Sequence, residues 1–146
     1  EMVPRVNRVA VLWNPSNPVF QTQMVNATEL AARSLGIELR MFAARNSDEI
    51  ERAFGLINND RVEALTVIVD PVFIEQRAQL TGLAITKRLP SVSQFRDYAA
   101  AGGLMAYAPD FSELGRRAAF SVDKILKGAE PGDLPVEQPT KFQLVR

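Results

Sequence analysis

Two side-chain amides and one carboxylate in this sequence stand directly after apolar runs, at points where strands of a sheet would end. Asn14 and Asn17 follow the run 9–13, and Asp70 follows the run 64–69. Side-chain amides, free backbone N–H groups and the positive end of a helix dipole can hold a small anionic group. A carboxylate such as Asp70 can pair with a ligand ammonium. These residues therefore predict a site for a small anionic or zwitterionic molecule.

Each of these polar residues also has a structural interpretation. Asn14 can shape a turn, while Asn17 and Asp70 each precede a proline, as the N-cap residues of helices often do. Capping and ligand binding can coexist at Asp70, so the sequence leaves both roles open.

Aromatic side chains follow the same predicted strand ends. They could stack on an aromatic or apolar ligand, or they could pack in the core or at its rim. The aromatic candidates are Phe73, Phe95, Tyr98 and Tyr107, and Gln94 adds a further amide. The ligand-binding set predicted from the sequence is Asn14, Asn17, Asp70, Phe73, Gln94, Phe95 and Tyr107.

The composition limits the chemistry of the chain. It has no cysteine and no histidine, which excludes disulfides, thiol catalysis and any site with a histidine base. The absence of both residue types argues against a hydrolytic enzyme, although it does not exclude catalysis by a carboxylate or a lysine. Asp48, Glu49 and Glu51 fall in a predicted first helical turn, where carboxylates favour the helix dipole, so we assign no metal. Gly102 and Gly103 lack the spacing of a phosphate-binding loop, and we assign no cofactor.

The overall charge and length narrow the class of protein. The 17 basic and 17 acidic residues give a net charge of zero, which argues against a broad basic surface for nucleic acid or an anionic membrane. No apolar run is long enough to span a bilayer. The first residues do not form a signal peptide, but a processed protein could have lost one. The sequence therefore does not determine the cellular compartment. A chain of 146 residues suits one domain.

Short apolar or alternating runs predict the strands. The runs 9–13 and 64–69 are too short for comfortable buried helices and rich in β-formers, so they predict strands covered on both faces. Alternation over 37–43 predicts a strand near the sheet edge. Shorter strands are expected at 91–94 and 104–107.

Apolar stripes at helical spacing predict four longer helices. The first begins at Pro18 and carries Gln21 on its polar side, and the third runs from Pro71 to about Arg88. The expected inward residues are Phe20, Met24, Ala27, Ala31 and Leu35 in the first helix, Ile50, Ala53, Phe54 and Ile57 in the second, Ile74, Ala78, Leu83 and Ile85 in the third, and Leu114, Ala118, Val122, Ile125 and Leu126 in the last.

This alternation of strands and helices predicts the fold class. It implies right-handed crossovers and an α/β fold with a doubly wound, mostly parallel sheet and helices on both faces. In such a sheet ligands bind beyond the carboxyl ends of the strands, where the candidate residues are expected. We expect residues 1–128 to form one α/β ligand-binding lobe. Residues 129–146 contain three prolines and are expected to form an extended tail, in the same domain or in a hinge, with a strand at 141–145.

Four segments of the sequence resemble one family of proteins. They are RVAVLWNPSNP at 8–18, VIVDPVF at 67–73, RLPSVSQFRDYAAAGGLMAYAPD at 88–110 and VDKILKGAEPGDLPVEQPTKFQLV at 122–145. The chain is similar, over nearly its whole length, to ABC-transporter substrate-binding proteins of the type linked to aromatic amino acid uptake.

The resemblance implies the fold of type I periplasmic binding proteins, with two α/β lobes joined by crossing strands and the ligand clasped between them. It implies that this chain is the second lobe, since a member would carry a whole lobe before Glu1 and a further segment after Arg146. Residues 1–6 resemble the junction behind the first lobe. It further implies no catalysis, a small-molecule ligand such as an aromatic amino acid, an ABC permease as partner, and a periplasmic, secreted or lipid-anchored parent protein.

Other functions stay open at this point. A small-molecule sensor or effector domain of a regulator shares the lobe design, and a flavodoxin-like enzyme could use Asp70 or Lys124 as acid or base. An isolated lobe should also expose apolar surface that a companion lobe covers. We therefore expect self-association, for example as a homodimer through the cleft or hinge edge.

Overall fold

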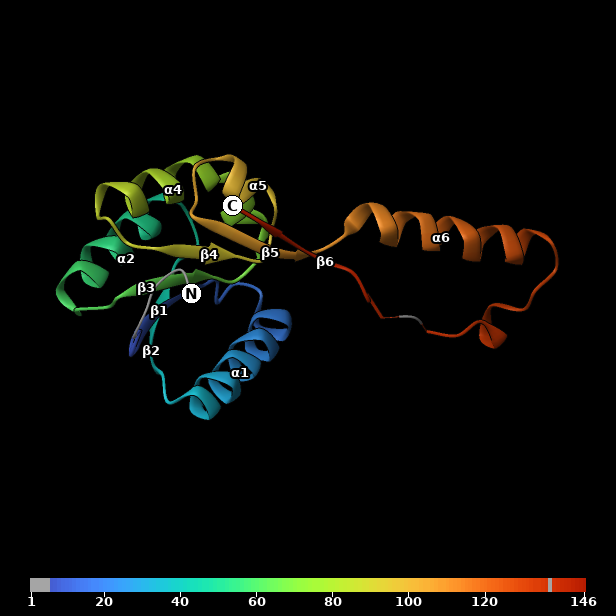
Figure 1. Ribbon diagram of the computed structural model, residues 1–146, viewed down its shortest axis with the longest axis horizontal. Coiled ribbons are helices and arrows are strands. Elements are labelled where there is room, and N and C mark those ends of the chain that lie inside the picture. Colours follow the sequence, from blue (N-terminus) through green and yellow to red (C-terminus); the bar gives the residue numbers. More distant parts are fainter. Residues whose placement is uncertain (1–5, 137) are drawn as a thin grey trace.

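A computed structural model describes residues 6–136 and 138–146, and it contains one six-stranded sheet (Figure 1). The strands are β1 (Arg8–Trp13), β2 (Glu38–Ala43), β3 (Ala64–Val67), β4 (Ser91–Ser93), β5 (Met105–Pro109) and β6 (Phe142–Val145). Their order across the sheet is β2-β1-β3-β4-β5-β6, and only the β5–β6 pair is antiparallel. The predicted mostly parallel, doubly wound α/β sheet is confirmed. Residues 1–5, in the predicted junction, lie outside the described residues.

Helices cover both faces of this sheet unevenly. They are α1 (Pro18–Leu35), α2 (Ser47–Asn59), α3 (Pro71–Glu75), α4 (Arg77–Thr86), α5 (Asp97–Ala100) and α6 (Phe111–Leu126). One face carries α1, the other carries α2, α4 and α5, and α6 extends away from the body of the domain (Figure 1). A 3-10 turn, Pro131–Asp133, follows α6.

Asparagine or aspartate residues occupy the N-cap positions of α1, α2 and α3. Asn46 Oδ1 accepts a hydrogen bond from the backbone N–H of Glu49 at 2.9 Å and so begins α2. Asp70 Oδ1 accepts from the N–H of Val72 at 3.0 Å and begins α3. Asn17 occupies the N-cap position of α1, but its side chain makes no capping hydrogen bond. The side chain of Asn17 is therefore not committed to the helix.

The hydrophobic core lies on the face covered by α2 and α4. Leu12 and Val67 are fully buried and contribute to the same cluster as Phe54 from α2. The predicted inward stripe of α2 is confirmed, because Ile50, Ala53, Phe54 and Ile57 are all buried. The parallel pairing of β1 with β3 places the carboxyl ends of these two strands side by side.

The buried face of α1 differs from the predicted stripe. Gln21 and Ala32 are its buried residues, while Phe20 is 40% exposed and Leu35 is 71% exposed. The helix is rotated about its axis because the amide of Gln21 hydrogen-bonds to groups at the ends of β1 and β3. Polar contacts, rather than the apolar pattern, therefore set the orientation of this helix.

The predicted third helix is interrupted at Gln76, which separates α3 from α4. The break shifts the phase of the helix, so that Leu80, Thr81 and Ala84 become its buried residues. Ile74 and Ile85, predicted to face inward, are exposed. The inward orientation predicted for the last helix is also wrong, since no residue of α6 is buried.

Gly103 is a position where a side chain does not fit. A Cβ atom there would lie 2.3 Å from ring atoms of Tyr98, a fully buried residue, and 2.8 Å from its carbonyl oxygen. We expect Gly103→Ala to lower the free energy of unfolding by about 2–3 kcal/mol, as measured by urea denaturation. Gly82→Ala is the matched control, because no atom lies within 4 Å of its added Cβ and it sits in the middle of α4. It should raise stability by about 0.5–1 kcal/mol, and equal losses at both sites would contradict the prediction.

Candidate functional site

The carboxyl ends of β1 and β3 bring together two residues that are far apart in the sequence. Asn14 Nδ2 donates a hydrogen bond to Asp70 Oδ1 at 2.9 Å. Both side chains are buried, at 4% and 3% exposure. Because the two strands are parallel neighbours, they end at the same edge of the sheet. The expected proximity of Asn14 and Asp70 is confirmed.

Gln21, which the sequence pattern places on the polar side of its helix, completes this polar cluster. Its Nε2 donates to the carbonyl oxygen of Val69 at 3.0 Å and to Asp70 Oδ2 at 3.3 Å. Its Oε1 accepts from the backbone N–H of Asn14 at 3.2 Å. The signal that could have identified Gln21 is its place in the first turn of the helix that opens at this edge.

The carboxylate of Asp70 receives only neutral hydrogen-bond donors in the described part of the chain. These are the amides of Asn14 and Gln21 and the backbone N–H of Val72. No described lysine or arginine forms an ion pair with it. A carboxylate offers about four acceptor positions, so roughly one stays open. A ligand cation is the partner that such a buried anion favours most.

Gln94 and Tyr107 lie on the next two strands of the sheet, Gln94 directly after β4 and Tyr107 within β5. Ser93 pairs with Ala106 in the register of β4 and β5, so the residues that follow them are level. With strands about 4.8 Å apart, Tyr107 lies roughly 10 Å from β3 across the sheet. Gln94 is half-buried and Tyr107 is 54% exposed. They can line the rim of a site whose buried end is Asp70.

The other two aromatic candidates lie inside the domain. Phe73 is fully buried and Phe95 is 5% exposed, and both belong to the core cluster. The ring of Phe95 meets the edge of Tyr98, with centroids 5.6 Å apart. Burial favours the packing role that the sequence left open for Phe73 and Phe95, in which they support the edge from within.

Residues 6–136 and 138–146 contain no group of three or more acidic side chains that could hold a metal ion. None of the helices in these ranges combines the length and the apolar character needed to cross a bilayer.

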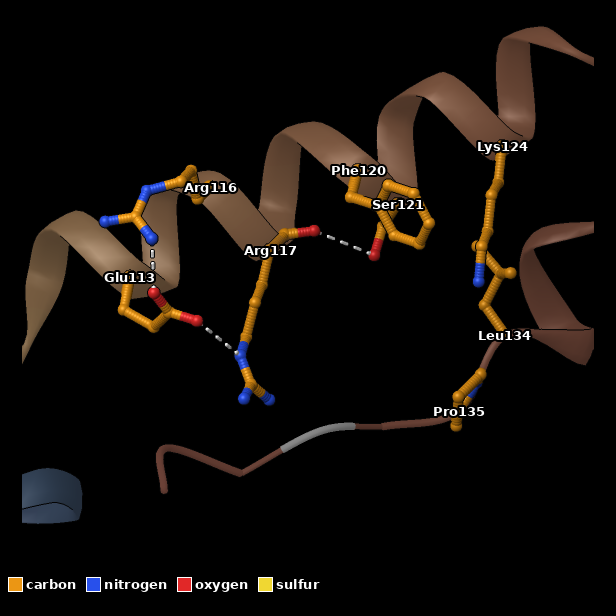
Figure 2. A pocket seen from close by; sticks show the side chains of 8 residues that line it. All are labelled: Glu113, Arg116, Arg117, Phe120, Ser121, Lys124, Leu134 and Pro135. Carbon is orange, nitrogen blue, oxygen red and sulfur yellow. Dashed lines mark hydrogen bonds and ion pairs between the residues drawn. The ribbon is translucent and has the colours of Figure 1, made fainter. Parts of the chain in front are cut away.

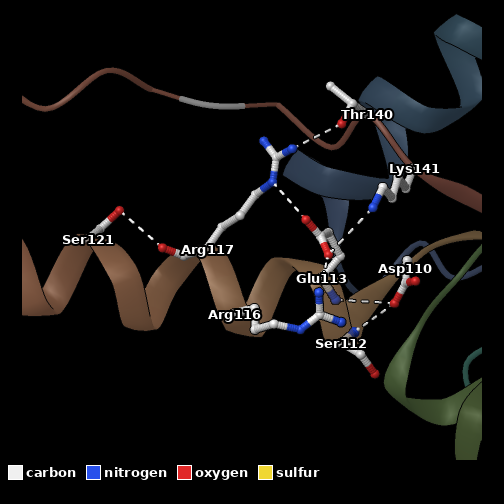
Figure 3. A network of polar contacts seen from close by, with 8 residues as sticks. All are labelled: Asp110, Ser112, Glu113, Arg116, Arg117, Ser121, Thr140 and Lys141. Carbon is white, nitrogen blue, oxygen red and sulfur yellow. Dashed lines mark hydrogen bonds and ion pairs between the residues drawn. The ribbon is translucent and has the colours of Figure 1, made fainter.

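A separate hollow of about 330 Å³ lies between α6 and the return segment, which we define as residues 127–136 and 138–141 (Figure 2). Three of its charged residues, Glu113, Arg116 and Arg117, pair with one another, and Lys124 Nζ lies 4.7 Å from the centroid of the Phe120 ring. Glu113 accepts from Arg116, lies 3.4 Å from Arg117 Nε and lies 3.8 Å from Lys141 Nζ (Figure 3). Arg117 Nη2 also donates to Thr140 Oγ1 at 3.2 Å. These contacts tie α6 to the return segment.

Asp110 stands between β5 and α6 and gives the helix a pH dependence. Its Oδ1 accepts from the N–H groups of Glu113 and Ser112, and these bonds, that of Glu113 first, hold the pKa of Asp110 below its ordinary 3.8. Since the folded pKa is lowered, the capping stabilisation is present above the unfolded pKa and is lost as pH falls through the folded value. We expect α6 to lose helicity below about pH 4, measured by NMR shifts of its amides. Asp110→Asn, which caps without titrating, should remove this acid step, and an unchanged pH profile would contradict it.

The geometry defines a class of protein. A parallel α/β sheet that gathers a buried carboxylate and several amides at its carboxyl edge is the architecture of small-molecule-binding domains. The family model described as ABC transporter substrate binding protein matches residues 1–145. The chain therefore belongs to the ABC transporter substrate-binding protein family, whose members bind solutes and are not enzymes. The assignment made from sequence resemblance is confirmed.

Three solved structures show the same fold. A conserved domain protein from Vibrio cholerae is 24% identical, with a TM-score of 0.85, over 99% of this chain and 48% of that one. The open, ligand-free structure of a substrate-binding protein with adhesive properties from Clostridium difficile is 19% identical, with a TM-score of 0.78, over 97% and 48%. An ABC domain from Streptococcus pneumoniae in complex with L-Trp is 24% identical, with a TM-score of 0.77, over 91% and 44%. The chain thus spans about half the length of each, and no curated protein sequence matches it significantly.

Proposed function

We propose that this chain is the second lobe of the solute-binding component of an ABC importer, and that the edge formed by β1 and β3 is one wall of its ligand cleft. The observation that carries the proposal is the buried Asp70 carboxylate, which has only neutral donors around it. In this role Asp70 receives the ammonium group of an amino acid or a similar small molecule.

The start of α1 supplies a complementary place for the ligand carboxylate. This helix has 18 residues and no acidic residue in its first turn. Its unpaired N–H groups and the positive end of its dipole favour an anion. The exposed amide of Asn17 stands at that start without a capping bond. A zwitterion could therefore lie with its ammonium at Asp70 and its carboxylate near Asn17.

The rim residues favour a ligand with an aromatic or apolar side chain. Gln94 directly follows β4, and Tyr107 lies within β5 at the level of Gln94. The half-exposed ring of Tyr107 offers a stacking surface. The structural relative from Streptococcus pneumoniae was solved with L-Trp bound, which makes L-Trp the first ligand to test. Phe73 and Phe95 would support this wall from the core.

The remaining parts of the proposal concern the whole protein. A companion lobe would supply the second wall, because the matched structures hold about twice the length of this chain. Substrate-binding proteins of ABC transporters typically act outside the cytoplasm and deliver their solute to a permease. We propose the same two properties for the parent protein: a periplasmic or lipid-anchored location, and an ABC permease as its partner.

Ligand-observed NMR titration of the chain with L-Trp tests the proposed pairing. Indole-3-propionate is the matched control ligand, because it keeps the indole ring and carboxylate and lacks the ammonium. We expect it to bind at least about tenfold more weakly than L-Trp, since it cannot pair with Asp70. Asp70→Asn should weaken L-Trp to a similar level and leave indole-3-propionate unchanged. Equal binding of the two ligands to the unmodified chain would refute the role of Asp70.

A further inference from the structure

The amino ends of β3 and β4 form the edge of the sheet opposite the proposed ligand wall. The turns that lead into these two strands, at 60–63 and 87–90, lie at the end of the domain away from α6 (Figure 1). A companion lobe that closes over Asp70 would leave this edge exposed. A ligand held here would therefore be independent of the solute in the cleft.

Three cations stand at this edge. Arg61 lies in the turn before β3, and Lys87 and Arg88 lie in the turn before β4. In the part of the chain that the structure describes, none of the three side chains forms an ion pair or a hydrogen bond. Lys87 is also half-buried, so its ammonium has lost part of its water without gaining a partner. An anion is the ligand that such a group favours.

The carboxylates nearest to these cations in the sequence are engaged elsewhere. Asp60 Oδ2 lies 3.7 Å from Arg40 Nε, and Glu63 accepts hydrogen bonds from the backbone N–H groups of Asn7 and Arg8. The positive charge of the two turns is therefore not neutralised by their own acidic residues.

Two of the cations occupy backbone positions that favour glycine. Arg61 and Arg88 have φ angles of 49° and 50°, in the left-handed region. In the turn between α1 and β2, this conformation is taken by Gly36, with a φ of 68°. A residue with a Cβ pays a conformational cost there that glycine avoids. The two guanidinium groups thus stand where the backbone alone would favour glycine.

The cations border two adjoining hollows. Arg61 and Lys87 line a hollow of about 80 Å³, Arg88 lines one of about 230 Å³, and Leu89 lines both. Apart from Arg88 and Ser91, the larger hollow is lined by apolar residues and a glycine, namely Ala84, Ile85, Leu89, Pro90, Gly102 and Leu104. Its side chains of Ile85 and Leu104 are 61% and 44% exposed. The edge therefore combines unpaired positive charge with an apolar hollow that is open to solvent.

We propose that this edge is a second binding site, for an anionic amphiphile with a carboxylate or phosphate head and one short alkyl chain. The head lies among Lys87 and the two guanidinium groups, where it forms charge-assisted hydrogen bonds. The chain lies in the larger hollow and removes Ile85 and Leu104 from water. A small anion alone would leave the apolar wall hydrated, and an uncharged chain would leave the cations unpaired. Charge and apolar surface together therefore define the ligand class.

Amide NMR titration of the ¹⁵N-labelled chain with octanoate tests the site. We expect saturable shift changes at Arg61, Lys87, Leu89 and Leu104. Acetate, which lacks the chain, and octanol, which lacks the charge, should each bind at least about tenfold more weakly. Equal binding of octanol, or octanoate shifts confined to other parts of the chain, would overturn the proposal. So would binding to phosphatidylglycerol vesicles without binding to octanoate, since that result would indicate a membrane surface.

Glycine variants separate the binding role of the arginines from a structural one. Arg61→Gly and Arg88→Gly suit the positive φ, so thermal unfolding should occur at the same temperature or a higher one. Together they should weaken octanoate binding at least about tenfold, because both guanidinium groups are lost. Arg33→Gln, on exposed α1, is the control and should leave the Kd unchanged. An unchanged Kd in the double variant would overturn the proposal.

The same titration distinguishes this site from the cleft. Asp70→Asn lies at the opposite edge of the sheet and should leave octanoate binding unchanged, whatever its effect on L-Trp. A loss of octanoate binding in Asp70→Asn would place the amphiphile at the ligand wall and overturn the proposal.

Discussion

Asp70→Ala is expected to lower the free energy of unfolding by about 2–4 kcal/mol, even in the absence of ligand. The substitution removes the acceptor of Asn14 Nδ2 and of Gln21 Nε2, and both amides are buried beside it. It also removes the cap of α3. A buried donor that loses its partner costs more than a lost bond between exposed groups, because it gives up its hydration without compensation. Urea denaturation measures the change.

Asp48→Ala is the matched control for this loss. Asp48 is exposed in the first turn of α2, and the change should alter stability by less than about 0.5 kcal/mol. If Asp70→Ala were equally mild, the polar cluster at the strand ends would not be a structural unit. A ligand site built on it would then have no rigid support.

Phe54→Ala is expected to produce the largest loss of stability, about 3–5 kcal/mol in urea denaturation. Its ring is fully buried in the core cluster between α2 and the sheet, with Leu12 and Val67 in the same cluster. The loss combines the transfer free energy of the ring with the cavity that it leaves. Because small domains are stable by only about 5–15 kcal/mol, a large fraction of the chain could unfold at 37 °C.

Leu56→Ala supplies the control from the same helix. Leu56 is 62% exposed, so its truncation should cost less than about 0.5 kcal/mol. Similar effects at the two positions would mean that α2 does not pack on the sheet through the face described here.

The sequence predicted the order and type of the main elements because their signals are local. The apolar run that became β1 ends at a polar turn with two prolines, and Asn17 and Asp70, each followed by a proline, mark the starts of α1 and α3. Since parallel strands end at one edge, the proximity of Asn14 and Asp70 followed from the topology alone. Such inferences need only the chain's own periodicity and caps.

The orientation of two helices could not be predicted from the same signals. In α1 the apolar pattern favours one face, but Gln21 forms three hydrogen bonds with the strand ends, and these turn the helix toward them. In α6 the predicted apolar residues do share one face of the helix, but the spacing of apolar residues does not indicate what that face contacts. The break at Gln76 carries no glycine or proline that would announce it.

The aromatic candidates show the same limit for the site. Phe73 and Tyr107 are both aromatic residues near strand ends, and composition gives no reason to separate them. The structure buries Phe73 completely and leaves Tyr107 54% exposed. Which side of the sheet a residue faces depends on register and on the helix above it, and therefore on contacts between distant parts of the chain.

Backbone amide NMR of the ¹⁵N-labelled chain during titration with L-Trp tests most directly whether the edge formed by β1 and β3 is the ligand wall. The predicted result is that the largest shift changes fall on Asn14, Asn17, Asp70, Gln94 and Tyr107, and on the side-chain amides of Asn14 and Gln21. Changes confined to the opposite edge, around Gly36, Asn59 and Ser91, or no change up to about 10 mM ligand, would contradict it.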